Sequence, residues 1–136
     1  MNLAIDEAWR QVLLAQSVFA AATIKVGTTG EIDPNSETFI RIQAGDLEHP
    51  AGNLHVGPVV FEIDSPALLD DPDILAGHQA FAAALVDLLR DRDALKTAFA
   101  ATDITLLGTH LVSSGGRQED VRWIFAATLQ GGYLAI

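Results

Sequence analysis

The sequence predicts an α+β fold in which a mainly antiparallel four-stranded sheet has a long helix packed on one face and another helix at the N-terminus. Three observations predict it: a long amphipathic pattern over residues 72–90, four short apolar stretches of extended character, and their order along the chain. That order is helix, strand, strand, helix, short helix, strand, strand, which favours an α+β layer architecture. At this length we expect one domain, residues 1–136.

The first element is a helix, because apolar residues recur near every 3.6 positions from residue 5 to residue 19: Ile5, Trp9, Val12, Leu13 and Phe19. We expect Asp6 and Glu7 in its first turn, where the helix dipole favours acidic side chains. Either Asn2 or Asp6 could be the N-cap. The glycines of residues 27–30 end regular structure, and residues 33–36 (Asp-Pro-Asn-Ser) indicate a turn.

Two strands follow, at about residues 38–44 and 56–63. In the first, Arg41 and Gln43 alternate with apolar neighbours. The second begins with Gly57-Pro58, and proline cannot donate to a sheet ladder, so we expect an edge position or a bulge there. The two could form an antiparallel pair.

The strongest helix begins at Pro72 after an Asp71 N-cap and continues to about Arg90, because this pairing matches the preferences of helix starts. Its apolar stripe is continuous: Ile74, His78, Phe81, Ala82, Leu85, Leu88 and Leu89. A charged link leads to a short helix over residues 94–101.

The last third predicts a hairpin with strands at residues 104–112 and 121–129 and a polar, glycine-bearing link at 113–120. In its second strand Trp123 and Phe125 share one face, and the opposite face carries Ile124 and Ala126, so both faces are apolar. Either helices cover both faces of this hairpin, or a neighbouring subunit covers one of them. We favour the neighbouring subunit, because the chain is short of helix.

The composition excludes some classes of function. The chain has 18 acidic and 8 basic residues, a formal charge of −10, and no cysteine. The charge disfavours an extended nucleic-acid footprint, and the missing cysteine excludes disulfides and thiolate sites. No apolar run is long enough to span a bilayer, and we expect no signal peptide.

The motifs that suggest chemistry each have a simpler structural explanation. His49 and His55 could share a metal with Glu48, but they lack the spacing of a helical metal site. The acidic residues 70–73 lack the glycine and distal glutamate of a calcium loop, and N-capping accounts for them. The serines and glycines of residues 113–116 do not form a nucleophile elbow. We therefore expect no enzyme activity, no catalytic residue, no cofactor and no metal.

Taken together, four features resemble the small tail-terminator or tail-completion proteins at the head–tail junction of tailed bacteriophages. They are the N-terminal helix with Trp9, the early strands ending in residues 61–66 (Phe-Glu-Ile-Asp-Ser-Pro), the leucine-rich helix at 78–90, and the hairpin around residues 119–123. The resemblance implies an α+β subunit that forms a ring, often a hexamer, on a tail tube and meets other tail or neck proteins. It also implies a location in the virion tail after assembly in the bacterial cytoplasm.

The sequence thus favours a structural, non-enzymatic, self-assembling subunit over an enzyme. The apolar side chains expected at its interfaces are Trp9, Trp123, Phe125, Tyr133, Leu134 and Ile136. Two alternatives remain open: a small-molecule-binding or enzymatic α+β domain, and an acidic host-side adaptor or immunity-type module. No membrane and no sequence-specific nucleic acid is expected as a partner.

Overall fold

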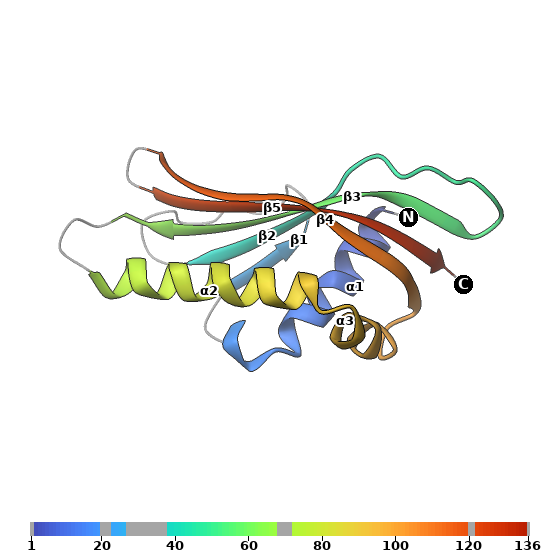
Figure 1. Cartoon of the computed structure of the whole chain (residues 1–136), viewed down its shortest axis with the longest axis horizontal. Coiled ribbons are helices and arrows are strands. Elements are labelled where there is room, and N and C mark those ends of the chain that lie inside the picture. Colours follow the sequence, from blue (N-terminus) through green and yellow to red (C-terminus); the bar gives the residue numbers. More distant parts are fainter. Residues whose placement is uncertain (1, 20–22, 27–37, 68–71, 120–121, 136) are drawn as a thin grey trace.

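The computed structural model describes residues 2–19, 23–26, 38–67, 72–119 and 122–135 (Figure 1). Its helices are α1 (Asn2–Leu14), α2 (Pro72–Arg90) and α3 (Arg92–Phe99), with a 3-10 turn η1 at Ser17–Phe19. Its strands are β1 (Thr23–Val26), β2 (Phe39–Ala44), β3 (Leu54–Pro66), β4 (Ile104–Glu119) and β5 (Arg122–Ala135). The predicted α+β class is confirmed.

The sheet has five strands in the order β1-β2-β3-β5-β4. The four predicted strands are antiparallel to their neighbours, and β1 adds to the edge of β2 in parallel. Strand β1 was not predicted, because four residues are too few to show a strand period. The fourth predicted strand is β5, which lies inside the sheet between β3 and β4, whereas β4 forms an edge.

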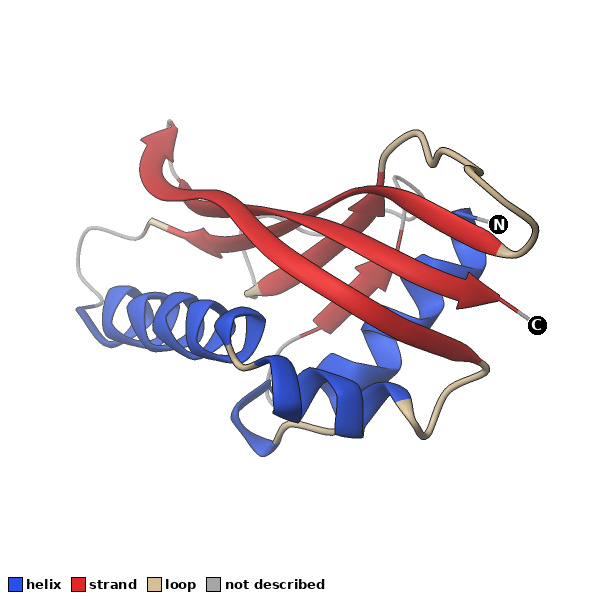
Figure 2. Cartoon of the chain, turned by 45° about the vertical axis from the view of Figure 1, so that its right-hand side comes forward, coloured by secondary structure: helices blue, strands red, loops and turns tan. Residues whose placement is uncertain are grey.

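All three helices lie on the same face of the sheet (Figures 1 and 2). One cluster of buried apolar residues joins them to the strands, with Leu13 from α1, Leu85 from α2 and Phe99 from α3. The predicted helix across one face is α2. The N-terminal helix covers this face as well, so it is not a cover for the other face.

The centre of the core is aromatic. The Trp9 ring makes edge-to-face contacts with Phe61 and Phe99, at centroid distances of 5.0 and 4.8 Å. Its indole Nε1 donates a hydrogen bond to Tyr133 Oη across 2.9 Å. This bond satisfies the only polar atom of a fully buried indole and ties α1 to the far end of β5.

Helix α1 begins earlier than expected, at Asn2, so Asp6 lies beyond the first turn and is not an N-cap. Its carboxylate instead accepts a hydrogen bond from the backbone N–H of Ala44, across 2.6 Å, at the end of β2. Asp6 is 3% exposed, and burial raises its pKa although this hydrogen bond acts in the opposite direction. The side chain thus fastens the helix to the sheet.

Pro58 lies within the central strand β3, where the sequence indicated an edge or a bulge. Followed along β2, the ladder with β3 ends at the pair of Ala44 and Val59, and Val59 is the residue that follows Pro58 in the chain. Beyond it, Gly45 N–H donates to the Pro58 carbonyl across 2.8 Å. A strand residue directs its N and O to the same side, so the missing donor of Pro58 falls where β2 has already ended.

The closing hairpin is longer than expected, because residues 113–119 are part of strand β4 and not a link. They continue the ladder with β5, as in the pairs Ser114–Ala127 and Arg117–Ile124. Serines and glycines do not break the strand here, since the backbone pairing with β5 holds it. Residues 120–121, which connect the two strands in the sequence, lie outside the described residues.

Candidate interaction surface

The sheet face opposite the helices, called here the open face, is the candidate site. Alternation along each strand assigns the residues on it, because their neighbours belong to the core. The open-face residues used below are Phe39, Arg41, Val60, Glu62, Asp64, Arg122, Ile124, Ala126, Thr128 and Leu134. No helix of the described part of the chain packs on this face.

An ion pair lies near one end of the open face. Arg122 Nε donates to the Asp64 carboxylate across 2.6 Å, and the Asp64 side chain is only 5% exposed. The Arg122 guanidinium also lies over the Phe39 ring, 5.0 Å from its centroid, and Arg41 contacts the same ring at 5.7 Å. These contacts keep Phe39 and Asp64 buried without any helix above them.

A hollow of about 590 Å³ lies over this ion pair, lined by Arg41, Glu62, Asp64, Glu119, Arg122 and Ile124. Two arginines face three carboxylates, so the hollow has no excess of positive charge for an anion. The charges lie where a partner of mixed sign could pair with them, which is typical of the polar rim of a protein interface.

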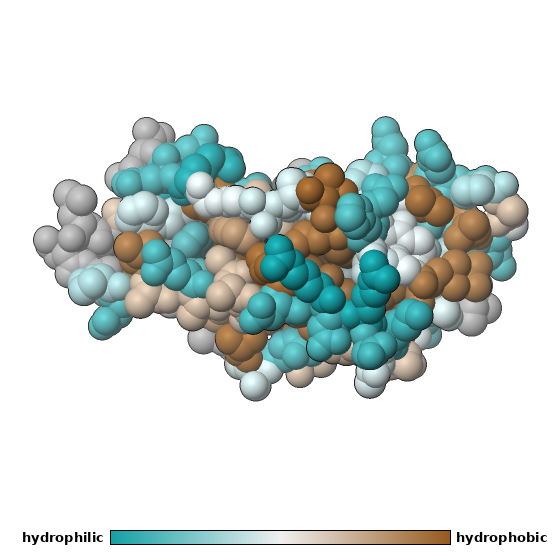
Figure 3. Space-filling model, in the orientation of Figure 1, coloured by the Kyte–Doolittle hydropathy of each residue, from teal (hydrophilic) through white to brown (hydrophobic). Residues whose placement is uncertain are grey.

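Apolar side chains continue along the open face. Val60 and Leu134 are each 38% exposed, and Ala126 and Thr128 are half-buried. On the side of the molecule that Figure 3 shows, in the orientation of Figure 1, apolar side chains reach the surface in several places between polar ones. The open face, with its aliphatic side chains and its ion pair, can support a moderate, partly polar contact, in which charged pairs set the register.

The structure separates the six side chains expected at interfaces. Trp9 and Tyr133 are fully buried and hydrogen-bonded to each other, so they stabilise the core and offer no surface to a partner; for these two the expectation was wrong. Trp123 and Phe125 are half-buried on the helix-facing side. Leu134 is exposed on the open face. Ile136 lies outside the described residues.

The structure brings His78 and Ser65 together, at 2.8 Å between Nδ1 and Oγ, and Ser65 also bonds Thr38 Oγ1 across 2.9 Å. A serine and a histidine at this distance can form a nucleophile and base. Here Ser65 and His78 are 1% and 6% exposed. Burial lowers the pKa of His78, and the negative charge of Asp64 opposes this shift. We therefore interpret the pair as a buried hydrogen bond that connects β3 with α2.

The other histidine pair also comes together. The rings of His49 and His55 meet edge to face with centroids 4.1 Å apart, and His55 is buried with no hydrogen bond to its Nδ1 in the described structure. Loss of hydration lowers the pKa of His55, and neighbouring His49 lowers it further. The described residues contain no group of three or more His, Asp or Glu side chains arranged to hold a metal ion.

Another hollow, of about 690 Å³, lies between α3 and the start of β4 and is lined mainly by apolar and small side chains, together with Lys96 and Asp103. No helix among the described residues is long and apolar enough to cross a membrane.

The cluster of Phe39, Asp64 and Arg122 on the open face was not predicted from the sequence. Its signal was the spacing of two residues between Phe39 and Arg41 and between Glu62 and Asp64, which puts each pair on the strand face turned away from the core.

No protein-family model and no curated protein matches the chain. Twenty-seven chains of solved structures do, and two of them serve as comparisons. A chain of the structure described as "Virion of native gene transfer agent (GTA) particle" has a TM-score of 0.57 at 14% identity, over 98% of this chain and 96% of that one. A second solved chain, without a functional description, has a TM-score of 0.56 at 12% identity, over 98% and 92%. At these identities the likeness shows a common fold: the chain shares its α+β architecture, nearly from end to end, with a chain of a gene transfer agent virion.

Proposed function

We propose that this chain is a structural, non-enzymatic subunit of a phage-like particle, acting at the head–tail junction as a tail-terminator or tail-completion protein. The observation that carries the proposal is the fold match with a chain of a gene transfer agent virion, which covers 98% of this chain and 96% of the other. Because the match covers both chains so fully, the likeness extends over the entire fold and not over a shared fragment. The resemblance in the sequence supports the same class.

The arrangement of layers supports self-assembly. The sheet has helices on one face only, and its open face displays Val60, Leu134 and the Arg122–Asp64 pair. Aliphatic side chains on an uncovered sheet face are stabilised when a second surface removes them from water. The open face is therefore the first candidate for contact with a neighbour or with another tail or neck protein.

The charge suits a position beside DNA. A net charge of −10 repels phosphate, so DNA could pass a ring of these subunits without binding to it. The proposal places the subunits in a ring, with six copies as the first stoichiometry to test, inside the virion tail after assembly in the bacterial cytoplasm. It needs no cofactor and no metal.

The test is the assembly state of the purified chain, measured by sedimentation velocity over a concentration series and by negative-stain electron microscopy. We expect oligomers that grow with concentration and appear as rings. The variant Val60→Lys places a charge on the open face and should weaken assembly. Val18→Lys is the matched control, because Val18 is similarly exposed (44% against 38%) on η1. A wild-type chain that stays monomeric at every concentration would contradict the proposal.

A further inference from the structure

The outer edge of β4 is a long strand edge with no neighbour among the described strands. Monomeric proteins usually protect such edges with charges, prolines, β-bulges or short strands. β4 spans 16 residues, and its ladder with β5 shifts register at two places, which leaves Leu107 and Val112 as extra residues. Both bulge residues are exposed, by 44% and 57%. At its two bulges this edge therefore displays aliphatic side chains, while its exposed ion pair, Arg117–Glu119, lies near the far end of the strand.

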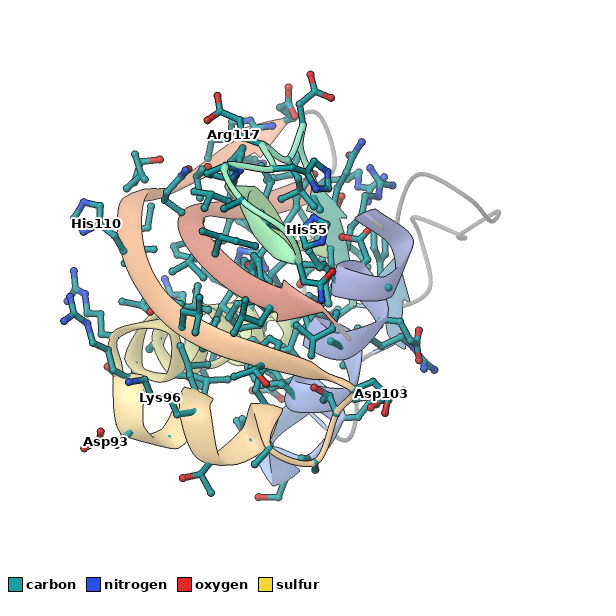
Figure 4. All side chains as sticks on the ribbon, turned by 90° about the vertical axis from the view of Figure 1, so that its right-hand side faces the viewer. His55, Asp93, Lys96, Asp103, His110 and Arg117 are labelled. Atoms are coloured by element: carbon teal, nitrogen blue, oxygen red, sulfur yellow. The ribbon has the colours of Figure 1, made fainter. Side chains whose placement is uncertain are left out.

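A basic hollow adjoins the same edge. It measures about 240 Å³, lies between the end of α2, the start of α3 and β4, and is lined by Leu89, Arg90, Arg92, Thr109, His110 and Leu111. None of the described residues that line it is acidic. Neither arginine forms an ion pair within the described part of the chain. Figure 4 shows His110, Lys96 and Asp93 from top to bottom along this side of the molecule.

The acidic residues nearby do not neutralise this hollow from within. Asp91 caps α3 by accepting a hydrogen bond from Ala94 N–H across 3.1 Å, and Asp93 belongs to the first turn of that helix. Both line an adjoining shallow depression together with Asp87 and with the same two arginines, Arg90 and Arg92. The two guanidinium groups therefore border β4 on one side and these carboxylates on the other.

The distribution of charge along the chain indicates the occupant. Residues 90–96 carry three of the eight basic residues, and outside this stretch five basic residues are set against sixteen acidic ones. A second copy of the chain is thus an acidic partner for this hollow almost wherever it makes contact. A two-fold contact of β4 with its own copy, centred on His110, would place Arg90 and Arg92 against themselves, which is repulsive. A head-to-tail contact avoids that repulsion.

We propose that the outer edge of β4 receives an acidic segment of a second copy of this chain, in a head-to-tail contact. The backbone of the segment adds to the free edge as a further strand, Leu107 and Val112 pack against it, and Arg90 and Arg92 bind its carboxylates. Contacts of this kind between unlike surfaces close into rings when the rotation permits. The inference rests on the proposed function, because it names the surface through which the subunit assembles.

The experiment measures assembly of the full chain by sedimentation velocity for the wild type, for Val112→Lys and for the double variant Arg90→Glu/Arg92→Glu. We expect each variant to weaken the apparent association constant by about tenfold or more, as loss of a buried charged contact does. Val18→Lys is the control and should assemble like the wild type. Rising salt should weaken wild-type assembly and have much less effect on the double variant.

The outcomes separate this inference from the proposed function. If the wild type assembles and both edge variants assemble like Val18→Lys, the β4 contact is wrong while the structural role stands. If the wild type is monomeric throughout, both are wrong. Arg90 and Arg92 are exposed, so the double variant keeps the test valid if Val112→Lys fails to fold, which far-ultraviolet circular dichroism would reveal. Mixing the Val112→Lys variant with the wild type tests whether the contact is head-to-tail. The variant keeps its acidic surface, so we expect it to bind to the β4 edge of a wild-type oligomer and to stop further growth of that oligomer.

Discussion

Tyr133 gives a sharp test of the core, because it is the single tyrosine of the chain and is fully buried. Burial raises the pKa of Tyr133 to about 12, and the negative charge of Asp6 adds to the rise; the hydrogen bond from Trp9 Nε1 opposes it. An unfolded tyrosine has a pKa of about 10. Since the folded value is the higher one, the stabilisation is complete below about pH 10 and is lost as the pH rises through 12.

The magnitude follows from the two pKa values. A difference of about two units corresponds to about 3 kcal/mol of unfolding free energy, a large part of the stability of a small domain. The near-ultraviolet absorbance of the phenolate reports the ionisation of this one residue, in native buffer and in denaturant. We expect a native midpoint about two units above the denatured one, or unfolding before ionisation.

The variant Tyr133→Phe separates the hydroxyl from the ring. It should remove the alkaline loss of stability, and at neutral pH it should cost about 1–3 kcal/mol, because Trp9 Nε1–H is left buried without an acceptor. Denaturant unfolding followed by tryptophan fluorescence measures both effects. A native midpoint near 10 in a folded protein, or a neutral Tyr133→Phe substitution, would show that the Trp9–Tyr133 contact is not as described.

Three further predictions concern single contacts. The pKa of Asp6 is raised from 3.8, so protonation of Asp6 favours folding at low pH, and this contribution is lost as the pH rises through the pKa of the folded state. The variant Asp6→Asn should remove this pH dependence of the unfolding free energy, which urea unfolding at several pH values measures. Asp64→Ala should cost about 1–3 kcal/mol by leaving Arg122 unpaired, whereas Glu62→Ala on the same face should cost less than about 1 kcal/mol, both by thermal denaturation. Gly57→Ala should cost about 1–3 kcal/mol, since its Cβ would lie 2.7 Å from a backbone oxygen; an unchanged melting temperature would contradict the loop packing.

The α+β class and the four antiparallel strands could be predicted because their signals are local. Alternation defined β2, the Asp-Pro start defined α2, and the apolar runs defined the hairpin. Strand β1 could not be predicted, because Thr23–Val26 is short and its pairing with β2 is a tertiary contact. The length of β4 was missed for the same reason: serine and glycine have low strand propensity, and only pairing with β5 keeps residues 113–119 extended.

The candidate site was predicted only in outline. Two apolar faces on the hairpin indicated that one would need a partner, and the structure leaves one face of the sheet without a helix. In β4 two bulges change which residues face which way, and alternation alone does not reveal them. Trp9 and Tyr133 looked like interface aromatics, but a bond between residues 124 positions apart places both in the core.

The central claim is that this chain assembles through its sheet, with the outer edge of β4 in contact with a second copy. Hydrogen–deuterium exchange of the β4 amides, compared between dilute and concentrated protein, tests it most directly because strand addition protects backbone N–H groups. We predict slower exchange in residues 107–112 at high concentration and little change in α2. Equal exchange of β4 at both concentrations, while sedimentation shows oligomers, would contradict the β4 contact.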